Sequence, residues 1–101
     1  MATTTKVLFR GAATTTVGTT LYTTPASTTT VVTNICVTNT AASAGTFTMA
    51  LAGTALHTTT AIAANSTIYI DLKQVLVATN TITGGASATT INFNISGVEI
   101  V

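Results

Sequence analysis

Residues 28–39 read TTTVVTNICVTN, the longest stretch of β-branched side chains in this sequence. Threonine, valine and isoleucine are stiff at χ1, which lowers their helix propensity and suits them to the pleated surface of a sheet. We therefore predict a central β-strand over residues 28–39.

Three further segments alternate apolar and polar side chains with period two, which is typical of half-buried strands. These segments are residues 47–51, 68–72 and 91–95. Together with the first stretch they supply the predicted hydrophobic core. Its members are Val32, Ile35, Val37, Phe47, Met49, Leu51, Ile68, Ile70, Leu72, Ile91, Phe93 and Ile95.

Shorter β-prone runs lie at residues 6–10, 17–23, 79–83 and 98–101, and turn signals separate them. Helix patterns are weak, and the strongest candidate is a single turn within residues 72–78. About seven or eight short strands, spaced by roughly ten residues, predict an all-β fold. We expect an antiparallel two-sheet β-sandwich that is either Ig-like or jelly-roll-like.

The first part of the chain has a different texture. Short runs of threonine punctuate residues 1–27, with few bulky apolar residues between them. Such a segment buries little surface to offset its conformational entropy. We therefore expect a threonine-rich, partly extended N-terminal arm over residues 1–27, which gains order from a neighbouring subunit. The β-sandwich domain is expected over residues 28–101.

The chain carries very little acid–base chemistry. Threonine accounts for 28 of the 101 residues, whereas charged residues make up 5%. About a quarter of the residues of an ordinary globular domain are charged. Apart from the two tyrosines, the ionisable side chains are those of Lys6, Arg10, Cys36, His57, Asp71, Lys73 and Glu99. This scarcity indicates a structural or binding role, so we expect neither enzymatic activity nor a cofactor.

Each reactive residue has a plain structural interpretation. One histidine, one cysteine and two carboxylates are too few for a metal site within the chain, and we expect His57 in a loop. Cys36 lies in an apolar stretch and is expected to be a buried, inert thiol, which argues against a nucleophile–base pair with His57. Asp71 and Lys73 lie two positions apart on one strand face and predict a surface ion pair.

The charge balance also limits the partners. Three cations are too few to neutralise several phosphates, so we expect no binding to nucleic acid. No run approaches the roughly 18 apolar residues that a membrane span requires, so we expect no membrane partner. A net charge of +1 gives little self-repulsion and favours association, so we expect a homo-oligomer.

Four phrases of the sequence resemble small virion structural proteins of tailed bacteriophages. They are VVTNICVTNT at residues 31–40, ANST at 64–67, IDLKQVL at 70–76 and NISGVEI at 94–100. Proteins of this kind include capsid decoration (cement) proteins and small tail or head-fibre components. The resemblance implies a sandwich module that works as an oligomer on a particle. It also implies synthesis in the host cytoplasm and a final location in the virion.

On this resemblance we expect a capsid decoration protein that binds and stabilises the assembled shell. It would be a homo-oligomer, with a trimer as the expected state, and its partner would be the major capsid protein or another virion protein. Arg10 is a candidate anchor to an acidic partner. The expected interface residues are Lys6, Leu8, Arg10, Val17, Leu21 and Tyr22.

Two other binding functions are alternatives for this sequence. A tail or fibre accessory module would bind a receptor or a glycan, with the ring of Tyr22 or Tyr69 stacking on a sugar and Asn92 or Asn94 donating hydrogen bonds. Ice-binding solenoids use ranks of Thr-x-Thr, and this sequence contains that motif. A solenoid needs a fixed repeat length, which these occurrences do not keep.

Overall fold

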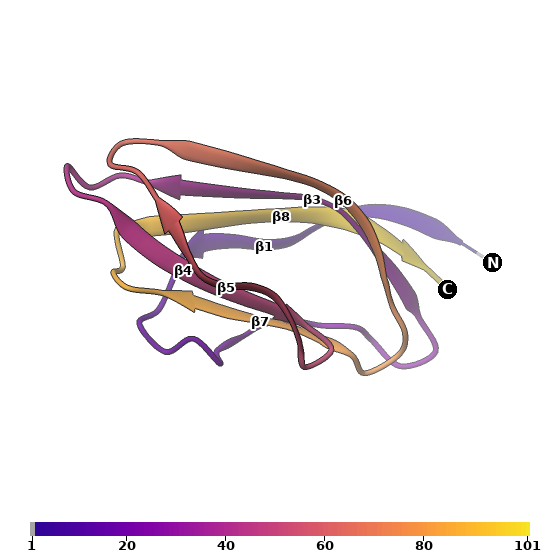
Figure 1. Ribbon diagram of the computed structural model, residues 1–101. Coiled ribbons are helices and arrows are strands. Elements are labelled where there is room, and N and C mark those ends of the chain that lie inside the picture. Colours follow the sequence, from indigo (N-terminus) through magenta and orange to yellow (C-terminus); the bar gives the residue numbers. More distant parts are fainter. Residues whose placement is uncertain (1) are drawn as a thin grey trace.

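The computed structural model describes residues 2–101 and shows eight antiparallel strands in two four-stranded sheets that pack as a sandwich (Figure 1). The strands are β1 (Thr3–Ala12), β2 (Thr20–Thr23), β3 (Thr29–Asn39), β4 (Gly45–Leu51), β5 (Thr54–Ile62), β6 (Thr67–Leu76), β7 (Thr81–Ala86) and β8 (Ile91–Ile100). Sheet A has the order β1-β8-β3-β6, and sheet B has the order β2-β7-β4-β5. The predicted all-β sandwich is confirmed. Within residues 2–101 there is no helix long and apolar enough to cross a membrane.

The strand pairing follows a single pattern. The first strand pairs with the last, β2 with β7, β3 with β6 and β4 with β5, as in one long hairpin. The additional pairs β3–β8 and β4–β7 complete the two sheets. A long hairpin wrapped into two four-stranded layers is the topology of a jelly roll. Of the two sandwich types expected, the structure is therefore the jelly roll.

The core lies between the two sheets, and all twelve residues predicted for it belong to it or pack against it. Eight of these are fully buried: Val32, Ile35, Val37, Phe47, Met49, Ile91, Phe93 and Ile95. The other four, Leu51, Ile68, Ile70 and Leu72, are partly buried and pack against that cluster. Phe47 of sheet B and Phe93 of sheet A meet edge to face with their centroids 6.2 Å apart, an arrangement worth about 0.5–1.5 kcal/mol beyond burial.

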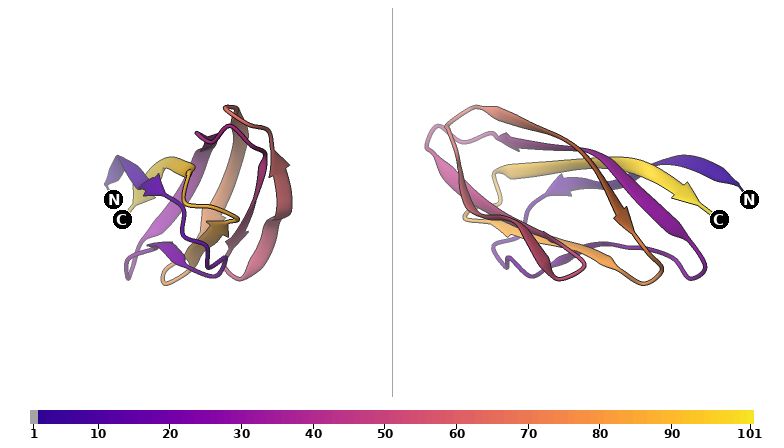
Figure 2. Two further views of the ribbon diagram at one scale, coloured as in Figure 1. Left: turned by 90° about the vertical axis from the view of Figure 1, so that its left-hand side faces the viewer. Right: turned by 45° about the vertical axis from the view of Figure 1, so that its right-hand side comes forward.

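Much of the segment expected as an arm takes part in this sandwich. β1 runs along β8 over its whole length, and β2 pairs with β7. Residues 13–19 connect β1 to β2 and run beside β7, where the N–H of Ala86 donates to the carbonyl of Thr14 at 2.9 Å. The chain ends lie side by side at one end of the molecule (Figure 2), where Ala2 and Val101 exchange backbone hydrogen bonds.

Some local expectations are wrong. Residues 72–78 form no helical turn, because β6 continues as a strand as far as Leu76. The runs at 91–95 and 98–101 form one strand, since β8 continues through Gly97. Strand β5 was not expected. It follows β4 through a two-residue turn in which Ala52 and Gly53 have φ of 51° and 79°, the positive values that a tight hairpin requires.

Candidate interaction surface

The outer face of sheet A is a broad surface with few charges. Alternate residues of its strands point outward, because the residues between them fill the core. The strand register aligns these outward side chains in rows that cross all four strands. One row consists of Thr5, Val98, Val31 and Val75, and another consists of Arg10, Asn94, Cys36 and Tyr69.

The first row is the apolar part of this face. Val98 and Val31 are half-buried in the middle strands, and Val75 is 61% exposed on β6. Beside the row lies a hollow of about 400 Å³, lined in part by Val7 and Thr33. The register of β1 and of β3 shifts next to these two residues, and such bulges bend a strand locally. The face is therefore both apolar and indented.

The second row carries a cation without a carboxylate partner. Arg10 Nε donates to Asn94 Oδ1 at 2.9 Å. The ion pairs among residues 2–101 are Lys6–Glu99 and Lys73–Asp71, so the Arg10 guanidinium belongs to neither. An exposed guanidinium of this kind is suited to bidentate contact with a carboxylate on another molecule.

The six residues expected at an interface do not share one surface. Leu8 and Tyr22 lie in the core, with 7% and 9% of their surface exposed, and Leu21 packs partly buried against it. Three of the six are accessible to a partner. Lys6 lines the hollow, Arg10 lies on the outer face of sheet A, and Val17 lies in the loop that packs against β7.

Tyr22 instead belongs to a polar cluster that connects the sheets. Its hydroxyl donates to Glu99 Oε2 and lies 2.8 Å from Thr30 Oγ1. Because the single proton of the phenol is used in the bond to Glu99, the Thr30 hydroxyl donates to the phenol oxygen. Lys6 Nζ lies 3.2 Å from the same carboxylate oxygen. The hydrogen bond from Tyr22 is the main cause that lowers the pKa of Glu99. The pKa of Tyr22 is raised, mainly by burial and secondly by the hydrogen bond to Glu99. This cluster has a structural role.

The structure corrects the expectations for Cys36 and His57. Cys36 is half-buried on the outer face of sheet A, because its neighbours Ile35 and Val37 occupy the inner positions. His57 lies in β5 and not in a loop, with its ring 5.2 Å from that of Phe47. The two residues belong to different sheets and form no pair. Within residues 2–101, no group of three His, Cys, Asp or Glu side chains could hold a metal ion.

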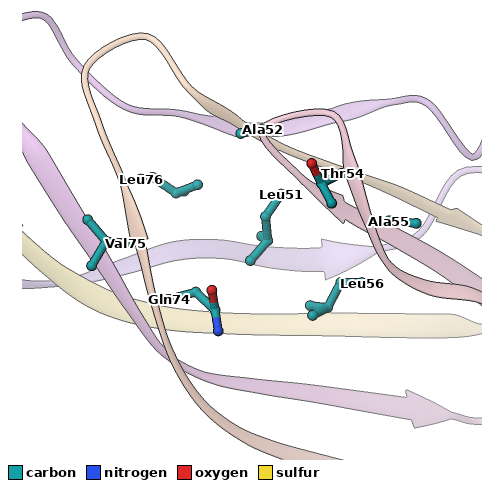
Figure 3. Close-up of a pocket in the computed structure, with 8 residues that line it drawn as sticks. All are labelled: Leu51, Ala52, Thr54, Ala55, Leu56, Gln74, Val75 and Leu76. Carbon is teal, nitrogen blue, oxygen red and sulfur yellow. The ribbon is translucent and has the colours of Figure 1, made fainter.

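A groove of about 380 Å³ opens between the β4–β5 hairpin and the end of β6 (Figure 3). Its lining residues are Leu51, Ala52, Thr54, Ala55, Leu56, Gln74, Val75 and Leu76. None of these eight side chains is titratable, so the groove offers apolar contact and hydrogen bonds but no group for general acid–base chemistry.

Comparisons with known proteins identify no relative of this chain. No family model matches it, and neither a curated protein nor a solved structure does. Its function is therefore inferred from its own fold, surface and sequence.

Proposed function

We propose that this chain is a non-enzymatic structural protein of a tailed-phage virion, specifically a capsid decoration (cement) protein that binds the assembled shell. The outer face of sheet A would make the contact. The observation that carries the proposal is the uncharged row Thr5, Val98, Val31 and Val75, which crosses the whole sheet beside an indentation.

The physical chemistry of this face suits adhesion to a large protein surface. Burial of apolar surface contributes roughly 25 cal/mol per Å², and the valines of the row supply such surface. A charge that is buried without a partner costs several kcal/mol. The row contains no charged side chain, so its burial against a partner carries no such cost. Arg10 lies on the same face, where it would add one directional contact to an acidic group of the partner.

The fold and the sequence resemblance support the same function. Jelly rolls occur in viral capsid proteins, as well as in lectins and cupins. A fold alone does not assign a function, so the resemblance to small phage virion proteins is the second support. The partner would be the major capsid protein or another virion protein. The chain would act as a homo-oligomer; the resemblance implies a trimer, whereas the open edge of β6 described below favours a dimer.

The test uses purified capsid shells that lack this protein. Light scattering and co-sedimentation would measure the binding of the wild-type chain, of Val7→Lys and of Val17→Lys. Both valines are about half exposed, 47% and 51%, but Val7 lines the hollow on sheet A whereas Val17 lies in the loop over sheet B. We expect saturable binding for the wild type and for Val17→Lys, and loss of binding for Val7→Lys.

Other outcomes would contradict the proposal in distinct ways. A wild-type chain that ignores shells at all concentrations would exclude decoration. If only Val17→Lys lost binding to the shells, the binding surface would be the loop of residues 13–19 and not the outer face of sheet A. An Arg10→Ala variant, with Arg10→Lys as its control, would show whether the cation takes part, because its contribution should weaken as salt is added.

A tail or fibre module that binds a glycan is the second candidate. The Tyr69 ring is 75% exposed and shares a row of the outer face with Asn94, and an exposed ring beside an amide can stack on a sugar and hydrogen-bond to it. Tyr22 cannot serve, because its ring is buried. A glycan array that gives signal with the wild type but not with Tyr69→Ala would support this candidate, and an empty array would exclude it.

A further inference from the structure

Strand β6 is an open edge of sheet A. It pairs with β3 on one side, and no strand of residues 2–101 pairs with its other side (Figure 1). Its ten residues therefore present a row of backbone N–H and C=O groups to solvent. Such an edge is a ready template for a strand from another molecule.

The other three edges are less suited to pairing. β2 has four residues, and β1 is interrupted by a register shift between Val7 and Phe9. β5 has two register shifts and a positive φ of 47° at Thr59. β6 has one register shift against β3, where Leu72 and Lys73 stand opposite Thr33. Tyr69 and Val75, on either side of that shift, pair with Cys36 and Val31 and face outward alike, so the side chains keep their alternating directions and a second strand could follow β6 in register.

Apolar side chains gather along this same edge. Tyr69 is 75% exposed and Val75 is 61% exposed, and both point to the outer face. Val77, just beyond the strand, is 57% exposed. Large exposed apolar side chains that cluster at an unpaired edge indicate a contact surface, whereas isolated ones carry no such meaning.

Two opposite charges lie between Tyr69 and Val75. Lys73 Nζ is 4.0 Å from Asp71 Oδ1, and the side chains are 78% and 87% exposed, which confirms the predicted surface ion pair. Read along the outer face, β6 thus presents an aromatic residue, an acid, a base and an aliphatic residue. A lysine on an edge usually prevents strand pairing, because it meets another cation or is buried without a partner.

This order is complementary to itself when two strands run antiparallel. With a two-fold axis at Leu72, Asp71 faces the partner's Lys73, and Tyr69 faces the partner's Val75. Opposite charges and aromatic–aliphatic pairs directly across two strands are both stabilising. We propose that two copies of this chain pair antiparallel through β6 about Leu72, forming one continuous eight-stranded sheet from two A sheets.

The charges also select this register against its neighbours. An axis at Asp71 would place that carboxylate opposite its own copy, and an axis at Lys73 would place two ammonium groups together. Like charges directly opposite destabilise a strand pair. A shift that pairs odd with even positions would set outward side chains against inward ones. The contact is isologous, so it closes as a dimer and does not extend into a fibre.

Sedimentation equilibrium on the full chain, without any shells, tests this contact. The variants are Asp71→Lys, Lys73→Asp and the double exchange Asp71→Lys/Lys73→Asp, with Val17→Lys as a control far from β6. We expect a dimer for the wild type and the control. Each single variant should weaken self-association by about tenfold or more, because both cross-strand charge pairs become repulsive.

Two restorations separate this mechanism from damage to the fold. An equimolar mixture of the two single variants should form a heterodimer, since the lysines of one chain face the aspartates of the other. The double exchange should form a homodimer again. A wild type that stays monomeric up to about millimolar concentration, a trimer indifferent to these substitutions, or a mixture that fails to associate would each overturn the proposal. Shell binding can fail without affecting any of these results.

Discussion

The hydroxyl of Tyr22 donates a hydrogen bond to Glu99 Oε2 and so joins β2 of sheet B to β8 of sheet A. The two residues are 77 positions apart in the sequence. The Glu99 side chain is only 12% exposed, and Lys6 supplies the opposite charge that a nearly buried carboxylate requires. The bond connects the layers at the end of the sandwich where the chain termini meet.

Replacing Tyr22 by Phe should destabilise the fold by about 1–3 kcal/mol, because it leaves Glu99 and Thr30 short of a hydrogen-bond partner in a largely buried site. Urea unfolding at neutral pH measures the loss. Tyr69→Phe removes the same hydroxyl from an exposed ring and should change stability by less than about 0.5 kcal/mol. Equal stability of the two variants would show that the Tyr22 bond contributes nothing.

Acid should weaken this connection in a defined direction. The pKa of Glu99 lies below its ordinary value of 4.5, chiefly because the Tyr22 phenol donates to the carboxylate, with Lys6 adding to the effect. The folded state then binds fewer protons than the unfolded chain around this pH. The stability that Glu99 contributes is therefore complete above 4.5 and is lost as pH falls through the lower, folded-state pKa.

The corresponding measurement is the urea midpoint from about pH 7 down to about pH 3. Glu99→Gln should be less stable than the wild type at pH 7 and should lose less stability on acidification. Asp71→Asn, which removes a carboxylate that is 87% exposed, is the control and should keep the wild-type slope. A wild-type slope in Glu99→Gln would assign the acid sensitivity to another group.

Two buried threonines, Thr24 and Thr30, should respond to replacement by valine with opposite changes in the free energy of unfolding. Thr24 is 1% exposed, and within residues 2–101 its Oγ1 has no hydrogen-bond partner. Thr30 is 0% exposed, and its Oγ1 is bonded to the Tyr22 hydroxyl. A buried hydroxyl without a hydrogen-bond partner lowers the stability of the fold. Removing a hydroxyl that has a partner lowers it too, because the partner group is then buried without a hydrogen bond.

Thr24→Val should therefore raise the free energy of unfolding by up to about 1 kcal/mol, and Thr30→Val should lower it by about 1–2 kcal/mol. Both substitutions exchange a hydroxyl for a methyl group of similar size in a strand or beside one. Thermal unfolding of the two variants side by side measures the difference. Destabilisation of equal size in both would mean that the Thr24 hydroxyl is satisfied after all.

The sequence predicted the parts of this fold in which alternation is uninterrupted. Over residues 47–51, 68–72 and 91–95, β4, β6 and β8 keep their large aliphatic and phenylalanine side chains on the inner face, so the period-two pattern identified these strands and part of the core. β5 gave no such signal, because its register shifts twice and Thr59 has a positive φ. Where a strand bends through a bulge, the alternation that would reveal it is lost.

The surface was harder to predict than the core. Leu8 and Tyr22 were expected at an interface because the first thirty residues contain few bulky apolar side chains. Both are buried, since Leu8 lies at the bulge of β1 and Tyr22 reaches Glu99 of the last strand. A contact across 77 positions leaves no local pattern. The ion pair of Asp71 and Lys73 was predictable, because its partners lie on one face of one strand.

Two glycines test how closely the loop of residues 13–19 packs on sheet B. A Cβ on Gly85 would lie against the carbonyl oxygen of Thr16 and 2.8 Å from Val17 Cα, whereas a Cβ on Gly18 would meet nothing within 4 Å. These contacts are backbone atoms, which cannot move to another rotamer as a side chain can. Gly85→Ala must therefore displace the loop of residues 13–19 from β7. The backbone hydrogen bond from Ala86 to Thr14 would be strained as a result.

Gly85→Ala should therefore destabilise the protein by about 1–3 kcal/mol, as overpacking of a close contact generally does. Gly18→Ala should be neutral or stabilise it by up to about 1 kcal/mol, because it restricts only the unfolded chain. Hydrogen exchange provides the second readout: a larger acceleration for the Ala86 amide than for the core amide of Phe93 in Gly85→Ala would place the damage at the loop. Wild-type stability in Gly85→Ala would mean that residues 13–19 do not rest on sheet B in solution.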